Sequence, residues 1–173
     1  MRVAKRRILA VGPRCAVAVI LSVLAAACAT DSAKAPPAMN AVGDRLPPFS
    51  LGDQHGEKHS VDERTRLILL SRDMDGGDVV KQVLTEQAGD YLGARHAVYV
   101  ADISRMPGFI SKTIAIPRMR DRSYPTLLDL EGSVTARLPS QPGKATLIRL
   151  DELTIAEVSY AGTSDELRAA LGI

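Results

Sequence analysis

The sequence predicts an α/β fold in which helices flank a central mixed β-sheet, and two stretches support this prediction. In the first, an apolar run over residues 67–70 is followed by a polar turn with two glycines and then by a segment with helical spacing. Four apolar residues are too few for a helix and fit a buried strand. In the second, strand-like segments at 145–150 and 154–160 precede a final helix. We expect the 67–70 strand to be central in the sheet.

Residues 1–27 have the three parts of a secretion signal: a basic start, an apolar run over 16–24 that only Ser22 interrupts, and small residues at the end. The run is shorter than the roughly 20 apolar residues that a membrane-spanning helix needs. We therefore predict an export signal peptide, with an uncleaved membrane anchor as the alternative.

The end of this signal, Leu24-Ala-Ala-Ala-Cys28, resembles the lipobox of bacterial lipoproteins. Ala27 fits that motif, whereas Ala25 stands where leucine is usually preferred. The resemblance implies that Cys28 becomes the first residue of the mature chain and carries lipid, so that the bilayer is a partner. Because Ala29 follows rather than aspartate, it also implies an outer-membrane lipoprotein facing the periplasm. The alternative is ordinary cleavage at the small-x-small site around Cys28.

Composition excludes several kinds of function. The chain has 22 basic residues, of which five precede Cys28, and 20 acidic residues, so the mature part has 17 basic side chains and a charge of −3. No basic surplus remains that would indicate a nucleic-acid partner. Cys15 leaves with the signal and Cys28 is acylated, so the mature globular part has no thiol for a disulfide or a nucleophile. Residues 28–41, rich in Ala, Pro and Ser, are expected to form a lipidated flexible tether.

Residues 43–56 open the globular domain, which we place at 42–173. Phe49 and Leu51 alternate onto one face of a short strand, His55-Gly56 makes a turn, and 58–61 returns as a second strand. The order of a glycine-aspartate pair, a proline, an aromatic-x-leucine strand, an aspartate and a turn glycine resembles the opening of peroxiredoxins and of thioredoxin-like lipoproteins. This resemblance implies a thioredoxin-like fold.

In these families, the turn after the central strand carries the reactive cysteines at a helix N-terminus. Carried over residue by residue, the resemblance places Asp75 and Asp78 at the two cysteine positions, with Gly76 and Gly77 between them. We expect Asp75 or Asp78 to cap a helix whose apolar face runs over residues 80–92 and which ends at Gly93. The resemblance therefore implies the fold without its redox chemistry.

The rest of the chain alternates in the same way. Residues 95–102 predict a strand, and Pro107 opens a helix with an apolar face at Phe109, Ile110, Thr113 and Ile114, which Pro117 should end. Segments 126–130 and 134–138 are expected to form an extra strand pair around a Glu131-Gly132 turn. A capping box from Thr163 to Glu166 precedes the last helix.

The cis-proline of this fold has two candidate positions. Lys144-Ala145-Thr146 lies at the expected distance from the carboxyl end, with alanine in place of proline. Tyr124-Pro125-Thr126 contains a proline but lies too far from that end. We prefer the first position, and expect a trans bond there because a non-proline cis bond costs roughly 3 kcal/mol.

Other candidate sites are weaker. Asp73, Asp75 and Asp78 could offer oxygen ligands to a hard cation, but the EF-hand spacing fails because Leu84 occupies the twelfth position, so capping and solvation are favoured. Met74, Met106 and Met119 could be soft copper(I) ligands, although methionines in apolar stretches usually belong to the core. The basic residues after Pro107 could meet an anionic partner or be solvated: Lys112, Arg118, Arg120 and Arg122.

Two function classes follow. The first is a non-catalytic, thioredoxin-like cell-envelope lipoprotein that binds a protein or another ligand, with no cofactor. The second is an envelope oxidoreductase or metal-handling protein that borrows its reactive group from a cofactor or partner. The absence of cysteine favours the first. The carboxylates of the 75–78 turn favour a protein partner in the envelope, or a cation, over an anion there.

Overall fold

The computed structural model describes residues 40–173. The predicted signal peptide, the lipidation site Cys28 and the tether as far as residue 39 lie outside the described residues. Asn40 and Ala41, which we assigned to the tether, donate backbone hydrogen bonds to the Arg137 carbonyl (2.7 Å) and the Asp44 carboxylate (2.8 Å). These bonds connect the end of the predicted tether to the described part of the chain. No helix in the described part of the chain is long and apolar enough to cross a membrane.

A five-stranded mixed sheet forms the centre of the domain, in the order β5 (Leu127–Asp129), β4 (Ala97–Asp102), β3 (Leu67–Ser71), β6 (Ala145–Asp151) and β7 (Thr154–Ala161). β3 is parallel to β4 and antiparallel to β6. The prediction that the apolar run is the central strand is confirmed. All five residues of β3 are buried, as expected of a strand covered on both faces.

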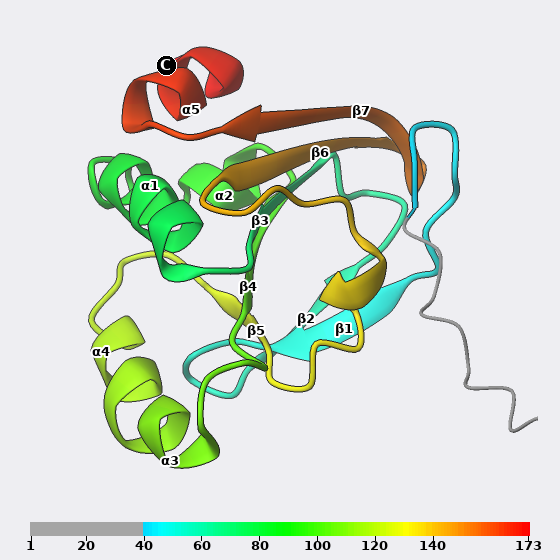
Figure 1. Cartoon of the computed structure of the whole chain (residues 1–173). Coiled ribbons are helices and arrows are strands. Elements are labelled where there is room, and N and C mark those ends of the chain that lie inside the picture. Colours follow the sequence, from blue (N-terminus) through cyan, green and yellow to red (C-terminus); the bar gives the residue numbers. More distant parts are fainter. Residues whose placement is uncertain (1–39) are drawn as a thin grey trace, which may run out of the picture. The chain divides into compact units, whose positions relative to one another are not determined.

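The alternation of side chains along β3 divides the core in two. Leu67 and Leu69 pack with the helices α1 (Met74–Thr85), α2 (Tyr91–Ala94) and α5 (Ser164–Leu171). Ile68 and Leu70 pack on the other face, beneath the antiparallel hairpin of β1 (Phe49–Gly52) and β2 (Lys58–Val61). Figure 1 shows α1 and α5 together on one side of the sheet and the hairpin on the other. This is the predicted architecture of a sheet flanked by helices.

The two ends of the domain follow the sequence prediction closely. The hairpin occupies the predicted segments, and α5 begins at the predicted capping box, where Thr163 accepts a hydrogen bond from the Glu166 N–H (3.2 Å). The return bond differs in one detail, because the Glu166 carboxylate accepts from the Gly162 N–H (2.7 Å) and not from that of Thr163.

The prediction for the helix after the central strand was wrong about its N-cap residue and about its length. Asp73, with φ −148° and ψ 175°, is the N-cap of α1, so neither Asp75 nor Asp78 has that role. The helix ends at Thr85, and Gly93 lies inside the separate short helix α2. Gly89 lies between the two helices, close to the Ser123 carbonyl oxygen, at a distance of 2.9 Å from where a Cβ atom would be. A glycine is a poor helix former, and this close approach fixes a bend at its position.

The segment after Pro107 also differs from the prediction. It forms α3 (Gly108–Ile110), the π-helical η1 (Ser111–Ala115) and α4 (Ile116–Met119) in succession. Pro117 does not end the helix, because the wider turn before it accommodates a residue that has no N–H. The predicted apolar face is wrong as well: Phe109 is 76% exposed, and Ile110 and Ile114 are also exposed.

Residues 134–138 do not form a strand, so the predicted extra strand pair is absent from the described residues. The segment contains the 3-10 helix η2 (Thr135–Arg137). The buried carboxylate of Asp129, at the end of β5, accepts hydrogen bonds from the N–H groups of Val134 (3.0 Å) and Thr135 (2.8 Å). These bonds draw the chain into a helical turn although its residue pattern suits a strand.

Candidate functional site

The candidate site lies where β3 ends and α1 begins. The carboxylate of Asp73 connects two segments that are distant in sequence: one oxygen accepts from the Gly76 N–H (2.8 Å) and the other from the Gly143 N–H (2.7 Å). Asp73 therefore caps α1 and ties it to the loop before β6. Because two N–H groups already use this carboxylate, it is a poor candidate for a metal ligand.

Gly76 makes the closest approach between these segments. A Cβ atom at Gly76 would lie 2.5 Å from the Lys144 carbonyl oxygen and 3.2 Å from the Ala145 nitrogen. The structure thus brings together the two stretches that the resemblance assigns to the altered redox site, 75–78 and 144–146. The bond between Lys144 and Ala145 is trans, since none of the described peptide bonds is cis. The side-chain hydroxyl of Thr146 is buried there, without a hydrogen-bond partner among residues 40–173.

Gly77 faces a pair of buried hydroxyl groups. The Ser71 and Tyr99 hydroxyl oxygens lie 2.8 Å apart, and a Cβ atom at Gly77 would be 3.7 Å and 3.9 Å from them. Burial raises the pKa of Tyr99, and this outweighs the opposing effects of Ser71 and Arg122. Tyr99 therefore stays neutral at physiological pH and contributes a neutral hydroxyl group to the site.

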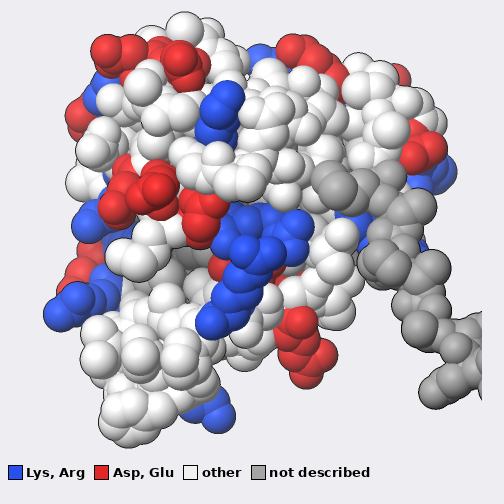
Figure 2. All heavy atoms as spheres, viewed as in Figure 1, with Lys and Arg blue, Asp and Glu red and all other residues white. Residues whose placement is uncertain are grey.

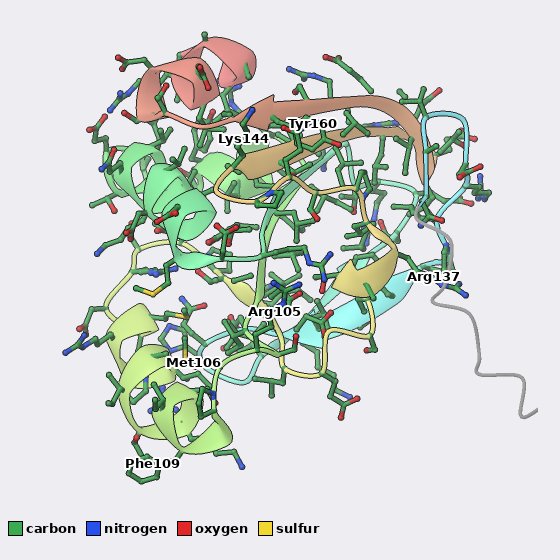
Figure 3. All side chains as sticks on the ribbon, in the orientation of Figure 1. Arg105, Met106, Phe109, Arg137, Lys144 and Tyr160 are labelled. Atoms are coloured by element: carbon green, nitrogen blue, oxygen red, sulfur yellow. The ribbon has the colours of Figure 1, made fainter. Side chains whose placement is uncertain are left out.

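A cavity of about 500 Å³ opens beside Gly77. Much of its wall is apolar and comes from α1, β4, the loop after β4 and α4: Met74, Tyr99, Ala101, Ile103, Met106 and Met119. The three methionines that the sequence analysis selected as copper(I) candidates all line this one cavity, and they are the only methionines in residues 40–173. Met74 is 78% exposed. Figure 3 labels Met106, which lies on the side of the molecule where α3 and α4 are.

Two charged groups in the cavity wall, Arg72 and Asp102, form an ion pair with each other. The Asp102 carboxylate accepts bonds from Arg72 Nε (3.0 Å), from the Thr135 hydroxyl (2.8 Å) and from Ser104. Burial alone would raise the pKa of Asp102. The hydrogen bonds from Ser104, Thr135 and Arg72 lower it by more, so the pKa lies below its usual value. Sequence analysis did not select this pair. The sequence could have indicated it, because Arg72 directly follows β3 and Asp102 ends the adjacent parallel strand β4, which places both residues at the same edge of the sheet.

Other charged groups in the wall remain unpaired. Arg105 is exposed and makes no ion pair or side-chain hydrogen bond within residues 40–173. Arg122 lies over the Tyr124 ring (5.8 Å) and donates to the Thr126 hydroxyl (3.4 Å), again with no carboxylate partner among the described residues. Asp78 likewise has no ion-pair partner in this part of the chain. Figure 2 shows basic side chains in the middle of this face, bordered by acidic ones, above a largely uncharged region over α3 and α4.

The remaining predicted candidates have mainly structural roles. Among the basic residues after Pro107, Arg120 donates to the Gln54 carbonyl (3.1 Å), whereas Arg122 lines the cavity. Tyr124-Pro125-Thr126, the other candidate position for the cis-proline, lies directly before β5. There the Thr126 N–H donates to the Gln54 side chain (2.7 Å).

A group that sequence analysis did not select lies in the β1–β2 hairpin. One ligand atom each from Asp53, Glu57 and His59 lies within 4.8 Å of the other two, a spacing that could suit a metal ion. However, Asp53 already accepts bonds from the His55 and Glu57 N–H groups (2.8 and 2.9 Å), and its other oxygen lies 2.9 Å from His59 Nε2. These bonds close the hairpin turn, which accounts for the cluster without a metal.

The close approach of Gly76 generates a matched pair of substitutions. Gly76→Ala should destabilise the domain by more than about 1 kcal/mol, because its methyl group would overlap the Lys144 carbonyl. Gly77→Ala meets only ordinary contacts and should be neutral or stabilising by up to about 1 kcal/mol, since alanine favours a helix. Urea unfolding followed by circular dichroism measures both changes. Equal effects of the two substitutions would contradict the close contact.

Asp102 predicts a dependence of stability on pH. Its lowered pKa means that it stabilises the folded state above the unfolded-state pKa of about 3.9, and that this contribution is lost as the pH falls through the folded-state pKa. Asp102→Asn should destabilise the domain by about 1–3 kcal/mol at pH 7, and the difference from wild type should shrink at pH 3. The exposed Asp121→Asn variant is the control. A difference for Asp102→Asn that does not change with pH would refute this assignment.

Comparisons with known proteins bear on the fold. No protein-family model and no curated protein matches the sequence. Solved structures do match. A peroxidoxin, BcpB, from Mycobacterium tuberculosis has a TM-score of 0.50 at 21% identity, with 76% of this chain and 94% of that chain covered. A putative protein disulfide isomerase from Bacteroides thetaiotaomicron has a TM-score of 0.50 at 15% identity, with 76% and 86% covered.

A hypothetical protein from Sinorhizobium meliloti matches with a TM-score of 0.50 at 19% identity, over 77% of this chain and 83% of that chain. At these identities, the likeness concerns the fold and not the activity. Together with the mixed five-stranded sheet and its flanking helices, the comparisons confirm the predicted fold class: the domain is an α/β protein with a thioredoxin-like fold.

Proposed function

We propose that the protein is a non-catalytic, thioredoxin-like lipoprotein of the cell envelope that binds a ligand or a protein partner at the N-terminus of α1. One observation carries this proposal. The corner that holds reactive cysteines in redox-active members of this fold contains Asp75-Gly76-Gly77-Asp78, and residues 40–173 contain no cysteine. A cavity of about 500 Å³ lies beside that corner, within the size range of small-molecule sites.

The chemistry of the corner argues against redox turnover. Two of the structural neighbours are named as a peroxidoxin and a putative disulfide isomerase. Disulfide exchange requires a thiolate that attacks sulfur, and peroxidase chemistry in this fold requires a thiolate that attacks peroxide. A carboxylate such as Asp75 or Asp78 forms no comparable redox couple. The buried hydroxyls of Ser71 and Tyr99 lie beside the corner, and burial raises the pKa of Tyr99, so it stays protonated.

A metal-handling role is the second candidate, and one observation favours it. Met74, Met106 and Met119 line the same cavity, and thioethers are soft ligands that suit copper(I). Arg105 and Arg122 line that cavity too, and their charges oppose the binding of a cation. We therefore rank this function below ligand binding.

The proposed location rests on the amino terminus. The export signal over residues 1–27 and the lipobox-like Leu24-Ala-Ala-Ala-Cys28 support acylation of Cys28. With Ala29 next to it, the lipoprotein would be delivered to the outer membrane and face the periplasm. Each buried methylene group contributes roughly 0.8 kcal/mol, so two or three acyl chains would hold the domain at the bilayer.

The proposal predicts an absence of thiol-redox activity. The mature acylated protein, purified from native membranes and reduced beforehand, should neither reduce insulin disulfides nor consume peroxide above the protein-free rate at pH 7. This sample has no free thiol, because Cys15 leaves with the signal peptide and Cys28 is acylated. A thioredoxin of known activity serves as the positive control. Turnover by the cofactor-free acylated chain would overturn the proposal.

Lipidation is tested independently. Mass spectrometry of the protein from native membranes should show a mature chain that begins at Cys28 and carries a diacyl or triacyl modification. A Cys28→Ala variant should lose both the modification and the membrane fraction. A soluble periplasmic product with a free amino terminus at Thr30 would show ordinary signal cleavage instead.

A further inference from the structure

We infer that the cavity beside Gly77 binds a small amphiphilic carboxylate, that is, an elongated apolar body that ends in one carboxylate group. The inference rests on the proposed function, because it names the ligand class of the same corner. It follows from two features of the cavity wall: its flexible apolar side chains and its unpaired arginines.

The apolar part of the wall suits a ligand body of variable shape. Three methionines reach the cavity from three different segments: Met74 from the first turn of α1, Met106 from the loop after β4, and Met119 from the end of α4. Methionine side chains are unbranched and polarisable, so they adapt to different apolar partners. The large exposure of Met74, 78%, leaves its side chain free to cover a bound molecule.

The charged side chains of the wall that are not already engaged decide whether the cavity favours an anionic or a cationic ligand. Arg72, Arg105 and Arg122 stand against Asp73, Asp78 and Asp102, so the wall has equal numbers of both charges. More of the carboxylates than of the guanidinium groups already bind other groups of the protein. Asp102 is bonded to Arg72. Asp73 has no ion-pair partner among the described residues, but both its oxygens accept from backbone N–H groups, and its charge lies at the N-terminus of α1, where the helix dipole offsets it. Arg105 and Arg122 also lack a carboxylate partner in this part of the chain, and Asp78 is the one carboxylate of the described wall that neither an arginine nor a backbone N–H group engages.

An unpaired arginine beside apolar walls is a good carboxylate receptor. Its planar guanidinium group donates two parallel hydrogen bonds to a carboxylate, and the apolar surroundings weaken solvent screening. Arg105 is exposed, and Figure 3 shows it in the middle of the face on which Figure 2 shows the basic side chains. Arg122 lies deeper, against the Tyr124 ring. The buried hydroxyls of Ser71 and Tyr99 add polarity without charge.

This placement also changes the expectation that the acidic turn repels anions. Asp75 does not line the cavity; its carboxylate lies near Gly143, on the side of the β6 loop. Both oxygens of Asp73 accept from backbone N–H groups, so among the described residues of the wall Asp78 is the one carboxylate that nothing else engages. The anionic end is therefore expected at Arg105 and not at the N-terminus of α1.

The methionines provide the test, because they report on the cavity directly. The mature acylated chain, labelled with ¹³C at the methionine methyl groups, gives signals from four residues, of which Met74, Met106 and Met119 line the cavity. The labelled chain is held in phosphatidylcholine nanodiscs and titrated separately with decanoate, decanol and decyltrimethylammonium. We expect decanoate to shift the signals of these three methionines and to bind more tightly than decyltrimethylammonium.

Arg105→Gln is the diagnostic variant, with Arg137→Gln as its matched control. Arg137 is also exposed and without an ion pair in the described chain, but it lies on η2, and Figure 3 shows it well away from Arg105. Arg105→Gln should weaken decanoate binding about fivefold and leave decanol binding unchanged. Arg137→Gln should change neither. Comparing each probe between chains removes the effect of its partition into lipid, and unchanged signals of the ligand-free variant show that its fold is intact.

Three outcomes would overturn the inference: no decanoate-induced shift of the three cavity methionines, equal decanoate affinity in the wild type and Arg105→Gln, or tighter binding of decyltrimethylammonium than of decanoate. None of them affects the proposed non-catalytic role. That role fails if the acylated chain reduces insulin or consumes peroxide, whether or not decanoate binds.

Discussion

The candidate site depends on one contact, the Asp73 carboxylate between the start of α1 and the loop before β6. Its two hydrogen bonds, to the N–H groups of Gly76 and Gly143, hold together segments some 70 residues apart in sequence. They are possible only because Gly76 has no side chain, since a Cβ atom there would lie 2.5 Å from the Lys144 carbonyl oxygen. Asp73 and Gly76 thus fix where the helix begins, and with it one wall of the cavity.

A second set of buried polar contacts fixes the opposite part of the site. Asp129 holds the turn that becomes η2, and Thr135 in that turn donates to Asp102. Asp102 in turn holds Arg72 at the end of β3. Asp102 accepts several hydrogen bonds, which favour its ionised form in spite of burial. This arrangement keeps Arg72 occupied, so Arg105 and Arg122 are the arginines of the wall that remain free for a ligand.

The sequence predicted those parts of the fold whose signal is local. The uninterrupted apolar run of β3 indicated a strand buried on both faces, and the Thr163 capping box indicated the start of α5. Where long-range contacts decide, prediction failed. Three aspartates within six positions could each cap α1, and the choice of Asp73 depends on Gly143. Residues 134–138 have a strand-like pattern, but Asp129 bends them into η2. The cavity was not predictable, because its wall combines residues from 71–78, 99–106, 119 and 122.

The same reasoning bears on the charge of the site, for which the sequence and the structure lead to different expectations. Counted along the sequence, the turn after β3 is acidic, and an acidic turn should prefer a cation or a basic partner. In the structure, a carboxylate is available to a ligand only to the extent that other groups do not already bind it. Backbone N–H groups bind Asp73, and the lowered pKa of Asp102 reflects the hydrogen bonds that it accepts. A ligand can form new ion pairs most readily with charged groups that nothing else engages. Within the described residues, Arg105 and Arg122 have no carboxylate partner, whereas Asp102 is held by Arg72 and Asp73 by backbone N–H groups at the start of α1. The two guanidinium groups therefore favour a carboxylate as the ligand's charged end.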